Sequence, residues 1–551
     1  MTDGIGPQAS QGRYLGMVVD GSMTRGAEIR LDGHTSVEDV RMGAFVTIQG
    51  EKHRFFGVVT DVGLASADAG LKHTPPGVQD PFIAQVVSGT VAYGSVKVMP
   101  TLTMPVVLGA SEGPSPARTV PAHFSRSFLA SEGDVEAVFG REDGRHFWIG
   151  NPLEMETKVC LDLGALVERS MGVFGKSGTG KTFLTRLLLV GVLQSDLASA
   201  LVFDMHSEYG WQGRSQGGTF VKGLKQLFPS RVAVFSLDEE SSRNRGLSPD
   251  EVVRIAYEDI EPEDIEVLQE NLGLSQVATD AAHDLARHFG ARSWLQEFSA
   301  MAGRDAVFDL ANEMNVNPQA LSALHTRLRR FHRYTFLGPK GREDSVRRIL
   351  EHLDRGMHVV LEFGRYGNDL NAYILVANLL TRRIHERYVR RKEEAEGRAA
   401  AEPRPLVITI EEAHKFLSPS VAPQTIFGTI AREMRKYNVT LMVIDQRPGA
   451  IDSEVMSQIG TKLTCLLDND RDIESVLGGA PGGRELRTVL SRLDSNREAL
   501  VFGHAVPMPV VVRTREYGSS GSYDELSRPV GSAADGPGRR RSLEEELNDL
   551  F

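Results

Sequence analysis

The feature that most constrains this chain of 551 residues is the glycine-rich segment GVFGKSGTGKTF at residues 172–183. It completes the pattern G-x-x-x-x-G-K-[ST] from Gly175 to Thr182. Glycines let the backbone curl so that successive N–H groups point inward and cradle the α- and β-phosphates of a nucleotide. Lys181 is expected to reach the β- and γ-phosphates, and the Thr182 hydroxyl to ligate Mg²⁺. The segment therefore predicts a nucleoside triphosphate site that uses ATP and Mg²⁺.

The residues on either side of this loop supply the structural context that the motif needs. RSMGVF at residues 169–174 is typical of a short buried strand, and TFLTRLLLVGVL at residues 182–193 has the apolar content of a helix packed on a sheet. The order strand, loop, helix is poorly explained by a chance glycine-rich turn, and the helix N-terminus adds its own attraction for anions. The predicted nucleotide-binding residues of the loop are Gly175, Lys176, Ser177, Gly178, Thr179, Gly180, Lys181, Thr182 and Phe183.

Length and charge narrow the class of protein further. The chain should hold about three or four domains at roughly 100–200 residues each. No apolar run approaches the ~18 residues that span a bilayer, and the first residues lack the hydrophobic core of a signal peptide. The net charge of −11 argues against a surface coated with nucleic acid but allows a local basic strip, such as the inner wall of a ring. Cys160 and Cys465, far apart among apolar neighbours, are expected to be reduced core residues of a cytoplasmic protein.

The pattern of elements changes several times along the chain. Short β-branched segments from about residue 12 to 150 predict a small β-barrel, and an α/β pattern begins near Val159. Helical spacing and caps from 247 to about 335 indicate an insertion, after which the α/β pattern resumes at residues 358–364. We therefore divide the chain into a barrel (1–150), a first part of an ATPase core (151–245), a helical insertion (246–345), a second part of the core (346–516), and a flexible linker with an amphipathic tail (517–551).

Two adjacent carboxylates follow the strand LVITI at residues 406–410. Ligands of open α/β sheets bind outside the carboxyl ends of strands, so Glu411 and Glu412 should lie beside the phosphates. We assign Mg²⁺ to Glu411, through its water shell, and the attacking water to Glu412 as general base. Aspartate is more usual at the first of these positions. The alternative is that the two glutamates cap the next helix.

A glutamine and three arginines are the remaining candidates for catalysis. Gln446 ends the next strand, where its amide can touch the γ-phosphate and the lytic water, unless it is an ordinary turn amide. Arg432 and Arg435 are three residues apart on a predicted helix and so share a face. Either could be supplied in trans to stabilise the phosphoryl-transfer transition state, although an ordinary solvated face explains them nearly as well. Arg169 is a further candidate.

Five segments together resemble a known family: GVFGKSGTGKT, FDMHSEY, VITIEEAHKF, IAREMRKY and DQRP, in this order. Their order is similar to that of the HerA branch of the HerA–FtsK superfamily, in its bacterial form, over roughly residues 10 to 516. The resemblance implies a RecA-like P-loop core with an N-terminal HAS-barrel-like domain. It also implies that Asp204 lies near the nucleotide and that Arg432, Arg435 or Arg169 is an inter-subunit arginine finger.

The resemblance also implies a function. Such proteins are homohexameric helicases that translocate double-stranded DNA through a ring pore, with a nuclease of the NurA type, in end processing for recombinational repair. One alternative is a conjugation or secretion ATPase, but these usually bring membrane helices. Another is a ring-shaped ATPase scaffold of an anti-phage defence complex that recruits an effector nuclease or NADase. The sequence does not identify the partner, the polarity or the residues that touch DNA, for which the loops 211–218 and 363–369 are candidates.

Two further features are left open by the sequence. His414 either couples the nucleotide site to DNA or is a hydrogen-bonded structural histidine. The final segment SLEEELNDLF at residues 542–551 begins with a capping-box pattern and places four apolar side chains on one stripe. So short a helix is marginal alone in water, so we expect it to dock on a neighbouring subunit or a partner. A frayed terminus is the alternative.

Overall fold

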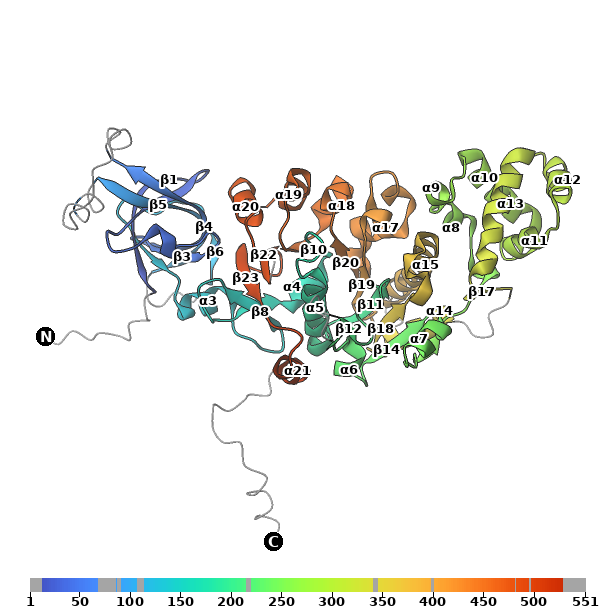
Figure 1. Ribbon diagram of the computed structural model, residues 1–551, viewed down its shortest axis with the longest axis horizontal. Helices are drawn as coiled ribbons and strands as arrows, with labels where there is room; N and C mark the ends of the chain where they lie inside the picture. Colours follow the sequence, from blue (N-terminus) through green and yellow to red (C-terminus); the bar gives the residue numbers. More distant parts are fainter. Residues whose placement is uncertain are drawn as a thin grey trace, which may run out of the picture.

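The computed structural model describes residues 12–528 except for 68–85, 87–90, 107–112, 215–219, 340–344, 398–400, 481 and 495–496. It confirms the predicted fold class: an α/β P-loop core, an N-terminal β-barrel and a helical insertion. The barrel and the insertion lie at opposite ends of an elongated molecule, with a large sheet between them (Figure 1). Among the described residues, no helix combines the length and the apolar character needed to cross a membrane.

The N-terminal domain is a closed barrel with its own core. Six strands follow one another in the order β2-β1-β7-β3-β4-β5, and β2 pairs back with β5 to close the ring. Closure removes the unpaired edges that an open sheet of this size would expose. Alternate side chains such as Leu15, Ile29 and Val46 point inward and are buried. The strands are β1 (Tyr14–Ser22), β2 (Gly26–Leu31), β3 (Phe45–Gln49), β4 (His53–Ser66), β5 (Ala92–Pro105) and β7 (Arg126–Leu129), with the short β6 (Ser115–Pro116) beside β5.

The centre of the molecule is a mixed sheet in the order β15-β14-β18-β11-β19-β20-β10-β21-β22-β23-β8-β9. The strands from β15 to β21 are parallel, and the remaining four are antiparallel. The parallel strands are buried on both faces, as their unbroken apolar runs require. Their bounds are β10 (Met171–Phe174), β11 (Ser199–Asp204), β14 (Val232–Ser236), β15 (Glu251–Val252), β18 (His358–Glu362), β19 (Leu406–Ile410), β20 (Val439–Asp445) and β21 (Thr461–Thr464).

The boundary between the barrel and the central sheet differs from the prediction. The sequence places the end of the barrel at residue 150 and the start of the α/β pattern near Val159. β8 (His146–Pro152) and β9 (Val159–Asp162) form a hairpin that extends the central sheet next to β22 (Glu498–Gly503) and β23 (Val510–Thr514). The central sheet therefore includes residues from His146 onward. A hairpin at a sheet edge has the same short, alternating pattern as a barrel strand, so the sequence does not separate the two.

Helices cover both faces of the central sheet. Figure 1 shows α17 (Ile426–Glu433), α18 (Ser453–Gln458), α19 (Asp470–Leu477) and α20 (Gly483–Leu490) in a row above it, with α5 (Lys181–Ser195), α6 (Leu224–Leu227) and α7 (Glu239–Asn244) below. The helix α5 that follows the glycine loop is buried from Leu184 to Leu193. Such an all-round apolar helix belongs in a protein interior. The other core helices are α3 (Glu132–Phe139), α4 (Leu163–Glu168), α14 (Ser345–Asp354), α15 (Leu370–Glu396) and α16 (His414–Leu417).

The insertion leaves the sheet after β15 and returns before α14. It holds α8 (Pro262–Glu266), α9 (Gln269–Leu272), α10 (Gln276–Phe289), α11 (Trp294–Ala300), α12 (Arg304–Met314), α13 (Pro318–Leu328) and the 3-10 helix η3 (Arg329–Arg333). The short strands β16 (Ile255–Ala256) and β17 (Leu337–Gly338) pair at its base. Serine, asparagine and proline start several of these helices: Ser275 caps α10, and Asn317 with Pro318 starts α13.

The C-terminal segment is more ordered than its composition predicts. Residues from 517 onward were expected to be flexible, but α21 (Ser520–Ser527) forms a capped helix. Ser519 closes a capping box, and Tyr523 and Leu526 are buried against the core. The expectation of flexibility is therefore wrong for this helix, because tertiary burial stabilises a segment that lacks strong helix formers. The predicted tail helix at residues 542–551 lies outside the described residues.

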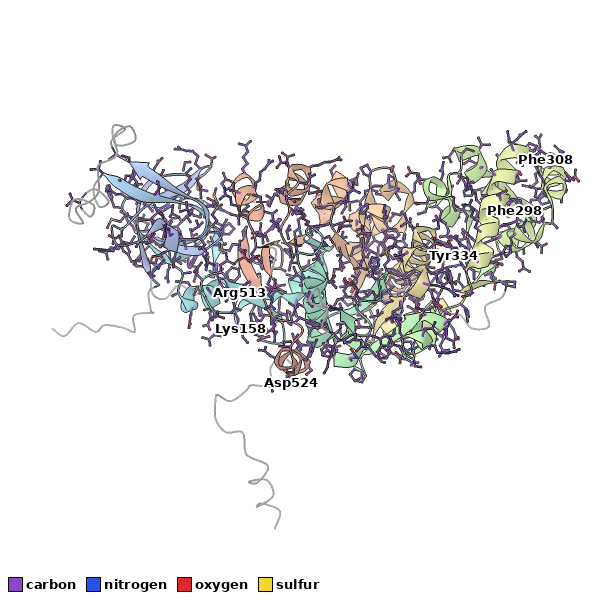
Figure 2. All side chains as sticks on the ribbon, in the orientation of Figure 1. Lys158, Phe298, Phe308, Tyr334, Arg513 and Asp524 are labelled. Atoms are coloured by element: carbon purple, nitrogen blue, oxygen red, sulfur yellow. The ribbon has the colours of Figure 1, made fainter. Side chains whose placement is uncertain are left out.

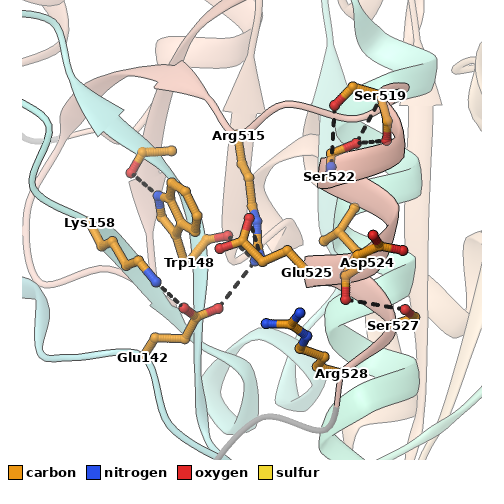
Figure 3. A network of polar contacts seen from close by, with 12 residues as sticks. Glu142, Trp148, Lys158, Arg515, Ser519, Ser522, Asp524, Glu525, Ser527 and Arg528 are labelled. Carbon is orange, nitrogen blue, oxygen red and sulfur yellow. Dashed lines mark hydrogen bonds and ion pairs between the residues drawn. The ribbon is translucent and has the colours of Figure 1, made fainter. Parts of the chain in front are cut away.

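A buried arginine fastens α21 to the edge of the sheet (Figure 3). Arg515 has a side chain that is 4% exposed and forms ion pairs with Glu142 at 3.1 Å and with Glu525 of α21 at 3.4 Å. Its guanidinium lies 4.4 Å from the ring centroid of Trp148. Lys158 pairs with the same Glu142.

We expect Arg515→Ala to destabilise the protein by about 3 kcal/mol, because it removes a buried guanidinium that pairs with both Glu142 and Glu525 and packs on Trp148. The matched control is Arg513→Ala, which removes an exposed pair with Glu156 and should change stability by less than about 0.5 kcal/mol. Thermal unfolding of the two variants against the wild type measures the difference. Equal unfolding midpoints for Arg515→Ala and Arg513→Ala would contradict a stabilising role for the buried pair.

Candidate nucleotide-binding site

The glycine loop joins the end of β10 to the start of α5, as the motif predicts. Gly175 has a φ of +151°, and a Cβ there would lie 2.8 Å from the Cys465 Cβ and from the Thr179 Oγ1. Gly180 has a φ of +97°, with no atom within 4 Å of the place where a Cβ would be. Both positions require glycine: the first for close packing against β21 and its extension, the second for its left-handed backbone. The loop can therefore present its backbone N–H groups to phosphate oxygens.

Lys181 lies folded over the loop at the N-terminus of α5. Its Nζ donates hydrogen bonds to the carbonyl oxygens of Gly175 at 2.7 Å and Lys176 at 2.9 Å. Burial lowers the pKa of Lys181, while nearby carboxylates, including Glu412, act in the opposite direction. The ammonium of Lys181 is thus held inside the loop, where phosphate oxygens would bind. When a nucleotide enters, its phosphate oxygens can replace the two carbonyl oxygens as hydrogen-bond acceptors.

A cavity of about 440 Å³ opens in front of this loop. Its walls come from the loop, α5, the segment after β11, and the ends of β19 and β20. Among the predicted residues, the cavity is lined by Ser177, Gly178, Gly180, Lys181, Thr182, Phe183, Glu411, Glu412 and Gln446. The carboxyl ends of strands distant in sequence therefore meet the phosphate loop, as expected for an open α/β sheet.

Glu411 directly follows β19 and is buried. One oxygen, Oε1, accepts a hydrogen bond from the Tyr209 hydroxyl at 3.0 Å, while Oε2 is buried with no hydrogen-bond partner among the described residues. Burial, followed by the charges of Asp204 and Glu208, raises the pKa of Glu411 to about 8. An unpartnered buried oxygen among like charges is the environment that a divalent cation relieves, so the donor set fits Mg²⁺.

Few other protein oxygens could bind Mg²⁺ directly, as is usual where a nucleotide supplies phosphate ligands. Among the described residues there is no group of three or more His, Cys, Asp or Glu side chains that could hold a metal alone. Mg²⁺ is usually bound by one or two protein oxygens together with substrate phosphates and water. Thr182 Oγ1 donates to Glu208 Oε2 at 3.1 Å, which places the predicted hydroxyl ligand in the same cavity as Glu411.

Glu412 contacts Gln446, the residue that follows β20. The Gln446 Nε2 donates to Glu412 Oε1 at 3.0 Å, and Glu412 has a φ of +47°, unusual for a residue with a side chain. The N-cap of α16 is Ala413, and no side chain caps that helix. The reading of the two glutamates as a helix cap is therefore wrong. A strained residue held beside a glutamine at the mouth of a cavity is typical of a functional site.

His414 stands behind this pair. Its Nδ1 lies 3.0 Å from Asp445 Oδ2 and 3.6 Å from Glu412 Oε2, and its backbone N–H also donates to Asp445. Asp445 is fully buried at the end of β20, next to Gln446. His414 thus links the ends of two neighbouring strands, the position of a structural histidine that also touches the proposed base.

Asp204 does not line the nucleotide cavity, in contrast to its predicted position. It is fully buried at the end of β11, and its two oxygens accept the backbone N–H groups of Glu208 at 2.8 Å, Tyr209 at 2.8 Å and Gly210 at 3.2 Å. These bonds shape the turn that carries Glu208 into the cavity and Tyr209 to Glu411. Asp204 therefore positions other residues of the site through the backbone of this turn.

Comparison with known proteins identifies the family. The family model described as the central domain of helicase HerA matches residues 147–384, from β8 into α15. The DNA double-strand break repair helicase HerA of Pyrococcus furiosus is 24% identical over 439 residues, which cover 74% of this chain and 76% of that protein. The protein of the same name from Sulfurisphaera tokodaii is 24% identical over 530 residues, which cover 91% and 93%. The chain is a HerA-type ATPase. Among solved structures, the bacterial conjugative coupling protein TrwB aligns at 12% identity over 72% of this chain and 95% of that one, with a TM-score of 0.46.

Two functional residues of this HerA-type ATPase were missed by sequence reasoning. Glu208, in FDMHSEY, contacts Thr182 and lines the cavity; its position four residues after Asp204, past a strand end, was the available signal. Arg186 is 2% exposed and donates from Nε to the Glu208 carbonyl oxygen at 3.1 Å. Its guanidinium lies within 5.7 Å of the rings of Phe183 and Tyr517. The sequence signal for Arg186 was a single arginine within the otherwise apolar segment that forms α5.

Two of the candidate finger arginines of the HerA-type ATPase, Arg432 and Arg169, do not line its own cavity. Arg432 donates to Glu454 Oε2 at 3.1 Å, and Arg169 is exposed at the amino end of β10, opposite the glycine loop. The helix α17 ends at Glu433 and continues directly as the 3-10 helix η6 (Met434–Tyr437), so Arg432 and Arg435 lie in consecutive helical segments and their shared face stays a prediction. The side chain of Arg435 is outside the described part of the structure. A role in trans for any of these remains a prediction.

Lys176 and Thr179, two further residues of the loop, make contacts outside the cavity. Lys176 Nζ pairs with Asp468 Oδ2 at 2.5 Å, and Thr179 Oγ1 donates to the Lys176 carbonyl oxygen at 2.8 Å. Neither residue lines the cavity, nor does Gly175. Their backbone groups still belong to the loop that the motif predicts.

Proposed function

We propose that this HerA-type ATPase hydrolyses ATP in the cavity and uses the energy to translocate along double-stranded DNA as a helicase in DNA end processing for recombinational repair. The observation that carries the proposal is the convergence of the glycine loop with Glu411, Glu412 and Gln446 in one cavity. The names of the two relatives, DNA double-strand break repair helicases, support DNA as the substrate. A cytoplasmic location is part of the same proposal.

The chemistry assigned to each residue follows from its position. Lys181 and the loop N–H groups bind the phosphates and orient the γ-phosphate. Glu412 takes a proton from the attacking water, and Gln446 holds that water and reports the state of the γ-phosphate to β20. Thr182 and Glu411 would hold Mg²⁺, which neutralises charge on the transferring phosphoryl group when bound. Glu208 keeps the Thr182 hydroxyl oriented.

A test of the DNA substrate is the ATP hydrolysis rate with and without duplex DNA. A translocase couples hydrolysis to movement, so we expect duplex DNA to raise the turnover number severalfold while the Michaelis constant for ATP stays similar. The same plasmid, either as a closed circle or cut once to give a linear duplex, shows whether DNA ends are needed for this stimulation. An ATPase whose rate is the same with and without DNA would contradict the proposal and favour a nucleotide-gated scaffold.

We further propose a homohexameric ring that works with a nuclease of the NurA type. Arg186 lines the cavity of its own subunit, whereas Arg432 and Arg169 do not, so a neighbour could supply a further arginine, as phosphoryl-transfer enzymes do in trans. In this arrangement, Arg432, Arg435 or Arg169 of one subunit completes the cavity of the next.

Mixing inactive subunits tests the trans arginine. Lys181→Ala subunits and Arg432→Ala/Arg435→Ala subunits are each expected to be inactive alone but to regain part of the ATPase activity together, because some interfaces combine two intact halves. An Arg169→Ala series run in parallel separates the candidates. Rings that form and exchange subunits, confirmed by native mass spectrometry, yet show no recovery would contradict a finger at these positions.

A further inference from the structure

The helical insertion carries a strong segregation of charge. From residue 246 to 313 it contains fifteen acidic side chains and four arginines. From 314 to 342 it contains no acidic residue at all, while arginine occurs at positions 327, 329, 330, 333 and 342. In a chain with a net charge of −11, so long a stretch without a carboxylate is a local basic strip rather than an average surface.

The segment that carries these arginines is held in a fixed position. α13 runs directly into η3, and Phe331 and Tyr334 are buried at 3% and 2% exposure. Tyr334 stacks on Phe336 with centroids 5.2 Å apart and meets Tyr366 of the core edge at 5.7 Å. Figure 2 shows Tyr334 at the inner end of the insertion, where it meets the rest of the molecule.

Arg327, Arg329 and Arg330 directly precede these anchors, on α13 and η3. Arg329 and Arg330 are exposed and Arg327 is half-buried, and within the described residues none of the three forms an ion pair. We call these three residues the arginine strip. Burial lowers the pKa of His325, and the Arg329 charge lowers it further. His325 therefore senses the positive charge of the arginine strip.

Other arginines near the strip are neutralised by carboxylates. Arg333 pairs with Asp369 at 2.5 Å, and Arg382 of α15 pairs with Glu261 and Asp264. Arg365, in the loop 363–369 that was a candidate for DNA contact, pairs with Glu240 at 3.0 Å. The arginine strip therefore differs from its surroundings in keeping its charge available to an external anion.

We propose that the arginine strip is a contact for the phosphate backbone of duplex DNA, separate from the nucleotide cavity. Arginine binds phosphate oxygens with two parallel N–H groups, and adjacent guanidiniums repel one another until an anion lies between them. A protein interface would need a buried apolar centre, but the exposed large apolar side chains of the described insertion are limited to Val277 on α10. DNA needs no such centre. The proposal rests on DNA being the substrate of this ATPase.

The test compares DNA binding by full-length Arg329→Gln/Arg330→Gln with that of the wild type, by fluorescence anisotropy of a labelled duplex over about 50 to 200 mM potassium chloride. We expect the log–log dependence of affinity on salt to become shallower by about two, and affinity at low salt to fall about tenfold or more. ATP hydrolysis without DNA should be unchanged, because the strip is not part of the cavity.

The matched control is Arg292→Gln/Arg304→Gln, which removes two exposed arginines elsewhere on the insertion. Arg304 lies over the ring of Phe308, which Figure 2 shows at the outer end of the insertion. This control should keep wild-type affinity and salt dependence. A wild type that binds no DNA would overturn the proposed function. If the wild type binds DNA and Arg329→Gln/Arg330→Gln binds it equally well, the arginine strip is not a DNA contact. An acidic protein surface would then be the alternative partner of the strip.

Discussion

The Glu412→Gln variant is expected to bind ATP with nearly wild-type affinity and to lose about 10²–10⁴-fold in turnover. Glutamine keeps the size of the side chain and can still accept from Gln446, whose amide lies 3.0 Å from Glu412 Oε1. What it lacks is the ability to take a proton from water. Binding of a fluorescent ATP analogue and release of phosphate measure the two effects separately.

A control for this variant is Glu396→Gln, the same chemical change on the exposed end of α15. It should leave both binding and turnover at wild-type values. Glu411→Gln provides a second comparison, since loss of a Mg²⁺ ligand should weaken Mg²⁺-dependent binding as well as turnover. Near-normal phosphate release by Glu412→Gln would show that another group is the general base.

The Lys181→Ala variant should lose both nucleotide affinity and ATP hydrolysis, with turnover reduced by roughly 10²-fold or more because a preorganised charge at the phosphates is removed. The loop contains its own control. Lys176, five residues earlier, pairs with Asp468 on the surface, with side chains 56% and 62% exposed. Lys176→Ala removes the same charge from the same loop and should change affinity by less than a few-fold.

Isothermal titration with ATP and steady-state phosphate release compare the two lysine variants directly. Both variants keep the glycines of the loop, so the loop conformation is preserved in each. Equal losses in Lys176→Ala and Lys181→Ala would mean that the loop acts through its total charge. That result would contradict the assignment of Lys181 to the phosphates.

The sequence predicts the parts of the site that obey local rules. The glycine loop is defined by spacing, and Glu411 and Glu412 are found because carboxylates that end a buried strand lie at the ligand-binding edge of a sheet. The barrel and the insertion are predicted by changes in periodicity along the chain. The loop and the carboxylate pair are each contained in fewer than about twenty consecutive residues, whereas the barrel and the insertion are recognised from a succession of such local patterns.

What the sequence does not predict depends on contacts between distant segments. The hydroxyl of Tyr209 reaches Glu411, 202 positions away in the chain, and this contact arises from the order of strands in the sheet. Asp204 was assigned to the nucleotide because a buried carboxylate and a ligand-binding one look alike in sequence. The helix α21 was missed because its stability comes from the burial of Tyr523 and Leu526, which composition does not reveal.

The most direct test of the account is displacement of a third strand from a DNA triplex. A translocase that moves along duplex DNA strips off the bound oligonucleotide without separating the duplex, and it does so only while it hydrolyses ATP. We expect the wild type to displace the oligonucleotide with ATP and Mg²⁺, and Glu412→Gln to bind the same DNA and displace nothing. A wild type that hydrolyses ATP at full rate on this DNA, yet leaves the triplex intact, would contradict a DNA-translocating motor.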